Sequence, residues 1–420
     1  MIRHSLKTIT AILLSISALS PVSCKKEGDT TLNMLVGTYT GASGSCGVYL
    51  YSFNPKDLGT VLQDSAAAIN PSFVIPSADR RFAYSVSECV DGTQGVYSYR
   101  LGPGRIEVLN KVDGCGGAPC NIAIAGNNIV TSDYIGGTLS VFPLKADGTV
   151  GEQCFSFAPA HDNSGTVSHI HCAALSPDGR YLFVTDLGAD AIYRADISGD
   201  IPENFIEVFN FDHCHPGLDP GPLASRDAGS KSGMTLDRHP GLDPGPLASR
   251  DAGSKSGMTL DCHPGLDHRH PGPRHLTFSP DGRFAYLISE KGDCVSTFSY
   301  DNGNLTLLET RLAYDGEGHG SGDIHLTPDG RFLYTSHRLK ADGIAVFERD
   351  SSTGLLKKTG YCPTGKHPRN FAITPDGTLL LCACRDDNRI EVYSIDPDTG
   401  ELRFTGKTIP VPAPVCIQLF

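Results

Sequence analysis

The chain of 420 residues contains 39% hydrophobic, 20% charged and 8% aromatic residues, the composition of a folded, water-soluble protein. It has 47 glycines, 28 prolines and no tryptophan, so frequent turns are expected and a bundle of long helices is excluded. With 35 basic and 47 acidic side chains, the formal net charge is -12. This charge disfavours binding to nucleic acid or to anionic membranes, and no basic cluster offsets it.

Residues 1–23 have the layout of an export signal, in which a basic start precedes a short apolar run. The run is too short to span a membrane as a helix. Cys24 follows a small residue and resembles the lipidated cysteine of bacterial lipoproteins; simple secretion after cleavage near Ser23 is the alternative. Residues 24–31 have almost nothing apolar to bury and predict a flexible tether. We therefore expect an exported protein of the periplasm or outer membrane that contacts the membrane only through a lipid anchor.

One pattern recurs along the chain at intervals of about 50 residues, a length typical of propeller blades. An apolar strand leads into a turn of the ProAspGly type, and a second apolar strand leaves it. A third, alternating strand and a variable outer strand complete each unit. Six units are explicit, and they begin at Pro71, Pro119, Ile170, Pro273, Asp323 and Pro368.

The two ends of this region supply a seventh unit. Residues 31–53 contain the second and third strands of a blade without a first strand, and residues 414–420 resemble the missing first strand. Joining both ends in one blade closes the ring and protects its edges. The sequence therefore predicts an all-β fold, a seven-bladed β-propeller over residues 32–420, with the C-terminal strand pairing into the N-terminal blade.

Residues 213–270 interrupt the propeller with near-identical copies that start at His215 and His239, and with a third start at His263. Near-identity indicates recent duplication, and the Gly-, Pro- and Ser-rich content has neither a strand period nor a helix period. We predict a disordered, solvated insertion. Its histidines are not expected to bind metal, because their spacing fixes no geometry.

Thirteen of the 14 cysteines remain once Cys24 is set aside, and their spacing does not support a disulfide framework. Cys382 and Cys384 share one strand face and are not expected to bond. Cys115 and Cys120 flank a glycine-rich loop that is able to close a disulfide; otherwise they are small buried hydrophobes, as we expect of the rest.

The expected blade topology brings residues from different units together in a candidate site. If each first strand lines the central channel and each ProAspGly turn lies at the bottom, the residues before the first strand and after the second meet at the top rim. Because this rim is outside the core, substitutions in it are expected to leave folding nearly unchanged. The polar residues gathered there are Tyr39, Glu88, Tyr134, His169, His171, Asp186, Arg274, His275, Glu290, Asp323, His325, Arg338, Arg369, Asn370 and Arg385.

Motifs at these positions carry a family resemblance. The ordered set includes GlyThrTyrThr from Gly37, HisIleHis from His169, GlyProArgHisLeu from Gly272, AspIleHis from Asp323 and LysHisProArgAsnPhe from Lys366. It resembles the propeller lactonases, which include the cation-independent bacterial 6-phosphogluconolactonases and the fungal carboxymuconate-lactonizing enzyme. The resemblance covers nearly everything from residue 32 to residue 420 apart from the insertion.

The resemblance implies catalytic roles for His169 or His171, for Arg274 and for Glu290. The remaining rim residues are candidates for substrate binding: Tyr39, Asp186, His275, Asp323, His325, Arg338, Arg369, Asn370 and Arg385. Cys120 and Asn121 depart from the family, which often has CysHis at this point, and the insertion ends directly before the GlyProArgHis motif.

Hydrolysis of a ring ester needs a base for water, a donor for the oxyanion, and groups that hold the polyol and any acid. The histidine, glutamate and arginine side chains at the top rim, which we call the cup, supply these groups. We therefore expect a lactonase that acts on a small-molecule lactone without a cofactor or metal. We also expect the protein to be a monomer. A HisXxxHis pair is also able to bind metal, but spacing fixes no third ligand. A noncatalytic ligand-binding propeller and a muconate cycloisomerase are the alternative functions. Sugar phosphates are normally held in the cytoplasm, so the predicted export argues against a phosphorylated substrate.

Overall fold

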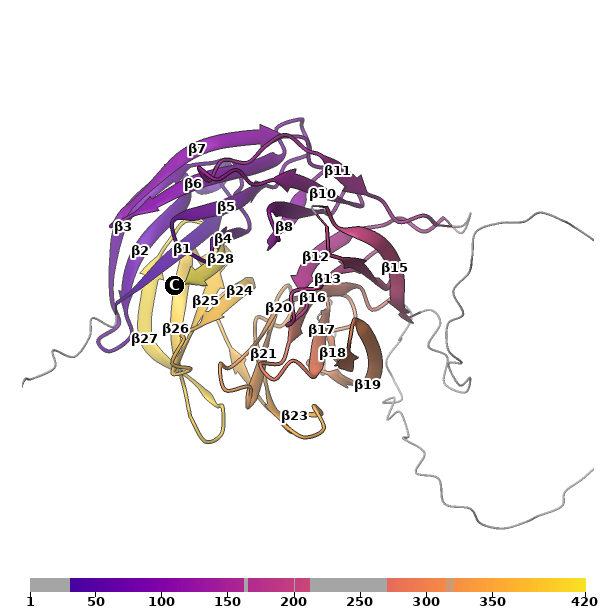
Figure 1. Ribbon diagram of the computed structural model, residues 1–420. Coiled ribbons are helices and arrows are strands. Elements are labelled where there is room, and N and C mark those ends of the chain that lie inside the picture. The colour runs from indigo at the N-terminus through magenta and orange to yellow at the C-terminus, as the bar shows by residue number, and fades with distance from the viewer. Residues whose placement is uncertain are drawn as a thin grey trace, which may run out of the picture.

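The computed structural model describes residues 31–161, 165–199, 201–211, 270–314, 316, 318 and 320–420. These residues form seven four-stranded sheets arranged in a ring around a central channel (Figure 1), which confirms the predicted seven-bladed β-propeller. The predicted signal sequence, Cys24, nearly all of the tether and nearly all of the insertion lie outside the described residues. In the part that is described, no helix is long and apolar enough to cross a membrane.

Six blades each use four consecutive strands, ordered from the channel outward. The first three are β4–β7 (Val74–Pro76, Phe82–Ser87, Gly95–Gly102, Arg105–Asp113), β8–β11 (Pro119–Ala125, Asn128–Asp133, Thr138–Pro143, Phe155–Phe157) and β12–β15 (Ile170–Leu175, Tyr181–Asp186, Ala191–Asp196, Glu203–Asn210). The next three are β16–β19 (Pro273–Phe278, Phe284–Ser289, Cys294–Asp301, Asn304–Leu312), β20–β23 (Ser321–Leu326, Phe332–His337, Gly343–Arg349, Leu356–Pro363) and β24–β27 (Pro368–Ile373, Leu379–Cys384, Arg389–Ile395, Leu402–Pro410).

The seventh blade joins the two ends of the propeller, as predicted. The C-terminal strand β28 (Pro414–Leu419) is the inner strand and pairs antiparallel with β1 (Leu32–Thr38). Strands β2 (Gly47–Asn54) and β3 (Gly59–Ala67) follow outward, and the 3-10 helices Gly41–Ser43 and Arg385–Asp387 lie in connections. Closure pairs the inner edge of β1, which would be free in an open ring.

The turns at the bottom of the blades show why the repeated pattern folds in this way. In the turn between β16 and β17, the Ser279 hydroxyl donates a hydrogen bond to Asp281 at 2.6 Å. Gly282 has φ +68°, a conformation that costs glycine little, so the chain reverses within four residues. Each inner strand therefore runs down the channel and its neighbour returns to the top.

The core lies between neighbouring blades. Val130 and Val141 of one blade, for example, pack in one buried cluster with Leu182 and Val184 of the next. Each blade has two faces to cover, and the ring supplies a neighbour for both of them. Burial of such aliphatic side chains stabilises the fold by roughly 25 cal/mol per Å² of apolar surface.

The structure decides between the two alternatives for Cys115 and Cys120, and it contradicts the expectation that the other cysteines are buried, because Cys46 and Cys154 are exposed. Cys115 and Cys120 are free thiols, so the disulfide between them does not form. The Thr131 hydroxyl donates to the Cys115 sulfur at 3.6 Å, whereas the Cys120 sulfur lies 3.8 Å from His171 Nδ1. The loop thus directs the two side chains to different surroundings. Cys382 and Cys384 are unbonded as expected, although their sulfur atoms are 3.9 Å apart.

Candidate active site

A bulge near the start of several inner strands directs one side chain out of the regular pairing. In β16, Pro273 pairs with Ser289 and His275 pairs with Ile288, which leaves Arg274 as an extra residue. Bulges of this kind change the direction in which a side chain points. The equivalent residues of the seven blades are Val415, Ser72, Cys120, His171, Arg274, Gly322 and Arg369. We call this set the bulge ring.

Glu290, the residue after β17, binds two arginines. Its Oε2 accepts a hydrogen bond from Arg274 Nε at 2.7 Å and lies 3.0 Å from Arg338 Nη2. Burial raises the pKa of Glu290, but Arg274, Arg338 and Arg369 lower it by more, so the net pKa is below its ordinary value. The carboxylate therefore stays ionised and holds the two guanidinium groups in place.

His171 completes this cluster. Its Nε2 is 3.9 Å from Glu290 Oε2, and its ring is 5.3 Å from the ring of His275. Burial and the nearby Arg274 charge hold the pKa of His171 well below its ordinary value, so the imidazole is neutral at physiological pH. The structure thus brings together His171, Arg274 and Glu290, which lie far apart in the sequence.

His169 lies on the other side of Tyr134. Its ring stacks on the Tyr134 ring with centroids 4.5 Å apart, while His171 meets the same ring edge-on at 5.6 Å. The Nδ1 of His169 is 2.8 Å from the Tyr134 carbonyl oxygen, which is only able to accept. Nδ1 therefore carries the proton, and Nε2 remains a hydrogen-bond acceptor.

Arg274 corrects one sequence-based expectation. We expected rim residues to lie outside the core, but Arg274 is only 1% exposed and is among the largest fully buried side chains. The bulge turns it inward against the neighbouring blade, where the Gly322 carbonyl oxygen accepts a hydrogen bond from its Nη1. Truncating Arg274 is therefore expected to affect folding, because the carboxylate of Glu290 would lose a buried partner.

Arg338 and Arg369 extend the positive charge around the cup. Arg338 Nη1 donates to His367 Nε2 at 3.2 Å, and burial lowers the pKa of Arg338 to about 9. Arg369 lies over the Tyr39 ring at 5.6 Å, and its Nη2 is 3.8 Å from a carboxylate oxygen of Glu88.

The hydroxyl of Tyr39 donates to the Glu88 carboxylate at 2.9 Å. The charged cluster contains three arginines and two glutamates, so its net charge is one positive unit. Its members are Arg274, Arg338, Arg369, Glu88 and Glu290. The cup therefore suits an anionic group.

Four predicted substrate-binding residues form hydrogen bonds with one another, although the His325 side chain is 40% exposed and His275 and Asn370 also line a small cavity. Asp323 is 3% exposed and accepts hydrogen bonds from His275 at 2.7 Å and from His325 at 2.9 Å. Asn370 donates to the same carboxylate and accepts from the Ile417 backbone at 2.7 Å. These partners occupy both oxygens of Asp323.

Asp186 and Arg385 have local partners. One oxygen of Asp186 accepts the backbone N–H groups of His169, Gly188 and Ala189 at 2.8, 3.0 and 3.0 Å, so Asp186 shapes the loop that carries His169. The Arg385 Nε donates to the adjacent Asp386 at 2.6 Å. Neither residue has a hydrogen bond to the Glu290 cluster among the described residues.

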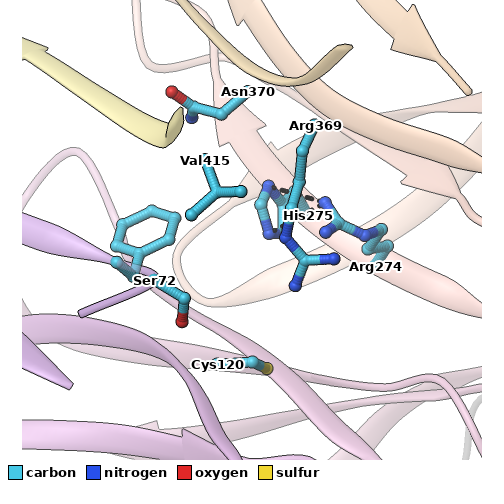
Figure 2. Close-up of a pocket in the computed structure, with 8 residues that line it drawn as sticks. Ser72, Cys120, Arg274, His275, Arg369, Asn370 and Val415 are labelled. Atoms are coloured by element: carbon cyan, nitrogen blue, oxygen red, sulfur yellow. Dashed lines mark hydrogen bonds between the residues drawn. The ribbon is translucent and has the colours of Figure 1, made fainter. Parts of the chain in front are cut away.

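A small cavity borders Arg274 (Figure 2). Its lining consists of Ser72, Phe73, Cys120, Arg274, His275, Arg369, Asn370 and Val415. Its volume is about 10 Å³, room for roughly one water molecule. The Ser72 hydroxyl and Arg338 Nε are buried and have no hydrogen-bond partner in the described part of the chain.

Sequence reasoning missed Ser72, Cys120 and His367 as part of the site. Ser72 and Cys120 follow Pro71 and Pro119, just as Arg274 and Arg369 follow prolines, so the repeat itself carried a usable signal for both. His367 lies in the LysHisProArgAsnPhe motif, but the motif did not assign it a role, because its contact with the site is made through Arg338. No three His, Cys, Asp or Glu side chains in the described ranges converge as ligands for a metal ion.

Comparison with known proteins agrees with this geometry. The chain matches the family described as "Lactonase, 7-bladed beta-propeller" over residues 33–214 and 260–419. It belongs to this family. The sequence-based assignment to the propeller lactonases, and with it the enzyme class, is confirmed. The unmatched residues between the two ranges fall within the duplicated segment.

Two curated relatives and two solved structures illustrate matches over nearly the full length of both chains. A 6-phosphogluconolactonase of Formosa agariphila is 30% identical over 92% of this chain and 99% of the relative, and that of Bacillus subtilis is 26% identical over 91% and 97%. A Bacteroides uniformis structure, provisionally named a 6-phosphogluconolactonase, is 38% identical with TM-score 0.76 and covers 93% of this chain and 100% of its own. The periplasmic gluconolactonase of Pseudomonas aeruginosa is 26% identical, with TM-score 0.72 and coverage of 93% and 99%.

Proposed function

We propose that this lactonase-family propeller hydrolyses a sugar lactone of the gluconolactone class. The observation that carries the proposal is the cluster in which Glu290 holds two buried arginines beside a neutral imidazole. The names of the relatives support the same substrate class. The net positive charge of the cup suits both a developing oxyanion and the carboxylate of the product.

In the proposed mechanism His171 accepts a proton from water, and the oxygen attacks the lactone carbonyl. The Glu290 carboxylate, 3.9 Å from His171 Nε2, stabilises the imidazolium that forms. Arg274 and the Nε of Arg338 stabilise the oxyanion. Collapse of the intermediate breaks the bond to the ring oxygen, which takes the proton back from His171. The product acid then ionises, so each turnover releases one proton.

His169 is the alternative base, because its Nε2 is an acceptor. We assign the role to His171 because it lies beside Glu290 and within the bulge ring, whereas His169 stacks on Tyr134. Tyr39, Arg338 and Arg369 are the proposed contacts for the sugar hydroxyls and for any acidic substituent.

We further propose that the enzyme is an exported monomer with a lipid anchor at Cys24. Export favours an unphosphorylated aldonolactone over a phosphorylated one, because sugar phosphates are held in the cytoplasm. Membrane fractionation that disappears in Cys24→Ala tests the anchor. An intact Met1 on a cytoplasmic protein contradicts export and favours the phosphorylated substrate.

The decisive test is acid release from a lactone panel that contains gluconolactone, 6-phosphogluconolactone and a muconolactone, with a metal chelator in parallel. We expect turnover of an aldonolactone above the spontaneous rate that the chelator does not change. Hydrolysis of every lactone at its spontaneous rate would contradict the enzyme and favour the noncatalytic binding propeller. Turnover confined to the muconolactone would favour the cycloisomerase.

A further inference from the structure

A hydrogen-bond network centred on Asp323 joins four blades. Oδ1 of Asp323 accepts from His275 Nδ1 at 2.7 Å, and Oδ2 accepts from His325 Nε2 at 2.9 Å. Asn370 Nδ2 donates to Oδ2 as well, and its Oδ1 accepts the backbone N–H of Ile417 at 2.7 Å. The inner strands β16, β20, β24 and β28 therefore meet around one buried carboxylate.

The buried Asp323 carboxylate decides which nitrogen of His275 carries the proton. An ionised carboxylate is only able to accept, so His275 Nδ1, 2.7 Å from Asp323 Oδ1, is protonated and donates to it. In the neutral ring Nε2 is then left as the acceptor for Arg274 Nη1, which lies 3.2 Å from Nε2 and 3.5 Å from Nδ1 (Figure 2). Burial and the charge of Arg274 lower the pKa of His275 to about 4, so this neutral tautomer persists at physiological pH.

Gly322, the residue before Asp323, contacts the guanidinium of Arg274 directly. The carbonyl oxygen of Gly322 accepts from Arg274 Nη1. A Cβ atom on Gly322 would lie 2.5 Å from Ser336 Oγ and 2.9 Å from the Arg369 carbonyl oxygen, so only glycine permits this approach. Arg274 is thus fixed at Nε by Glu290 and at Nη1 by two consecutive residues of β20, one of which acts through His275.

We propose that Asp323 is a positioning residue for Arg274, acting through the tautomer of His275, rather than a substrate ligand. The inference rests on the proposed function, in which Arg274 stabilises the transition state. A planar guanidinium stabilises an oxyanion best when its donors are fixed before the reaction. The buried Asp323 carboxylate supplies that fixation from the adjacent blade.

The Asp323→Asn variant removes this fixation with little change of volume. Three side-chain donors converge on the carboxylate, but an amide offers a single acceptor oxygen, so donors are left unpaired and the tautomer of His275 is no longer set. We expect kcat to fall by about 30-fold while KM changes by less than about threefold. Asp329→Asn, in the bottom turn of the same blade, is the matched control and should leave kcat unchanged within about twofold.

A double-mutant cycle separates positioning from a general structural effect. In an Arg274→Gln background, Asp323→Asn should cost less than about twofold, because the group that it positions is gone. Full additivity of the two losses would overturn the inference, as would an Asp323→Asn variant with wild-type kcat. Melting temperatures of all variants are measured alongside.

A second measurement does not depend on turnover. The nitrogen NMR shifts of His275 in the wild-type protein should report a protonated Nδ1 and an unprotonated Nε2, and Asp323→Asn should remove this preference. A His275 protonated at Nε2 in the wild type would overturn the network. Wild-type protein that turns over no lactone but shows the expected tautomer would refute the proposed function and leave the network standing.

Discussion

The bottom and the top of this propeller use equivalent positions in opposite ways. At the bottom, five turns share one hydrogen bond, in which a Ser or Thr hydroxyl donates to the Asp two residues later at 2.6 Å. These are the turns at Asp79, Asp178, Asp281, Asp329 and Asp376. At the top, the bulge ring carries Val, Ser, Cys, His, Arg, Gly and Arg at one equivalent position. Repetition at the bottom builds the fold, whereas variation at the top builds the site.

The two ends also differ in the range of their interactions. The hydroxyl-to-Asp hydrogen bonds of these bottom turns join residues two apart in sequence, although Arg349 of the next blade also donates to Asp281, whereas the bond between His275 and Asp323 at the top joins residues 48 apart. Loss of a bottom contact should therefore affect local stability, and loss of a top contact should affect chemistry. The predictions below test that division.

The largest effect is expected for Glu290→Gln. Without the carboxylate charge, Arg274 and Arg338 repel each other and the imidazolium of His171 loses its counter-ion. We expect kcat to fall by at least about a hundredfold. Steady-state kinetics on the lactone that the panel identifies provide the measurement, and activity within about threefold of wild type would place the site elsewhere in the cup.

Asp281→Asn is the counterpart at the bottom. Asp281 accepts from Arg349 at 2.9 Å and from Arg283 at 3.0 Å, so its neutralisation weakens contacts to two guanidinium groups. We expect a loss of roughly 1–3 kcal/mol in the free energy of unfolding, measured by urea denaturation, with kcat per folded molecule unchanged. A selective loss of kcat without loss of stability would contradict the division between the two faces.

The pH dependence of activity is the third test. A general base must be unprotonated to act, and burial with the Arg274 charge keeps the pKa of His171 below its ordinary value. Lowering the pH from 7.5 to 6 should therefore leave the base neutral and change kcat/KM by less than about twofold. An acidic limb with its midpoint near pH 6.5, the ordinary histidine value, would contradict the assignment of His171.

The smallest effect is expected for Arg385→Gln. Arg385 occupies a rim position equivalent to Arg338, but its Nε donates to Asp386, which follows it in the chain. We expect kcat/KM to remain within about twofold of wild type, since exposed ion pairs contribute little. Arg338→Gln is the comparison variant and should lose activity, because Arg338 contacts Glu290 directly. Equal losses in the two variants would show that position on the rim, rather than contact with Glu290, determines function.

The blades themselves were predictable because their signals are local. A ProAspGly turn between two apolar strands needs only about ten consecutive residues to specify it, and the repeat multiplies that signal. The closing strand followed from counting strands at the two ends. The pairing of Arg274 with Glu290 was also predictable, because a strand that runs down and a strand that returns bring their outer ends together.

The contacts between blades were not predictable in the same way. Cys115 and Cys120 are close in sequence, yet the fold sends their sulfur atoms to different partners. Asp323 is placed on the rim by its sequence position, but neighbouring blades enclose its carboxylate.

The sequence by itself determined the number of blades, the closure of the ring and most of the polar residues at the top. Only the tertiary structure decided which of those residues act together. A bulge sets the direction in which each side chain of the bulge ring points. The neighbouring blade then determines which groups that side chain contacts. For that reason Arg274 reaches Glu290 of its own blade and Gly322 of the next, while the Arg385 side chain at the same rim donates to Asp386, its neighbour in sequence.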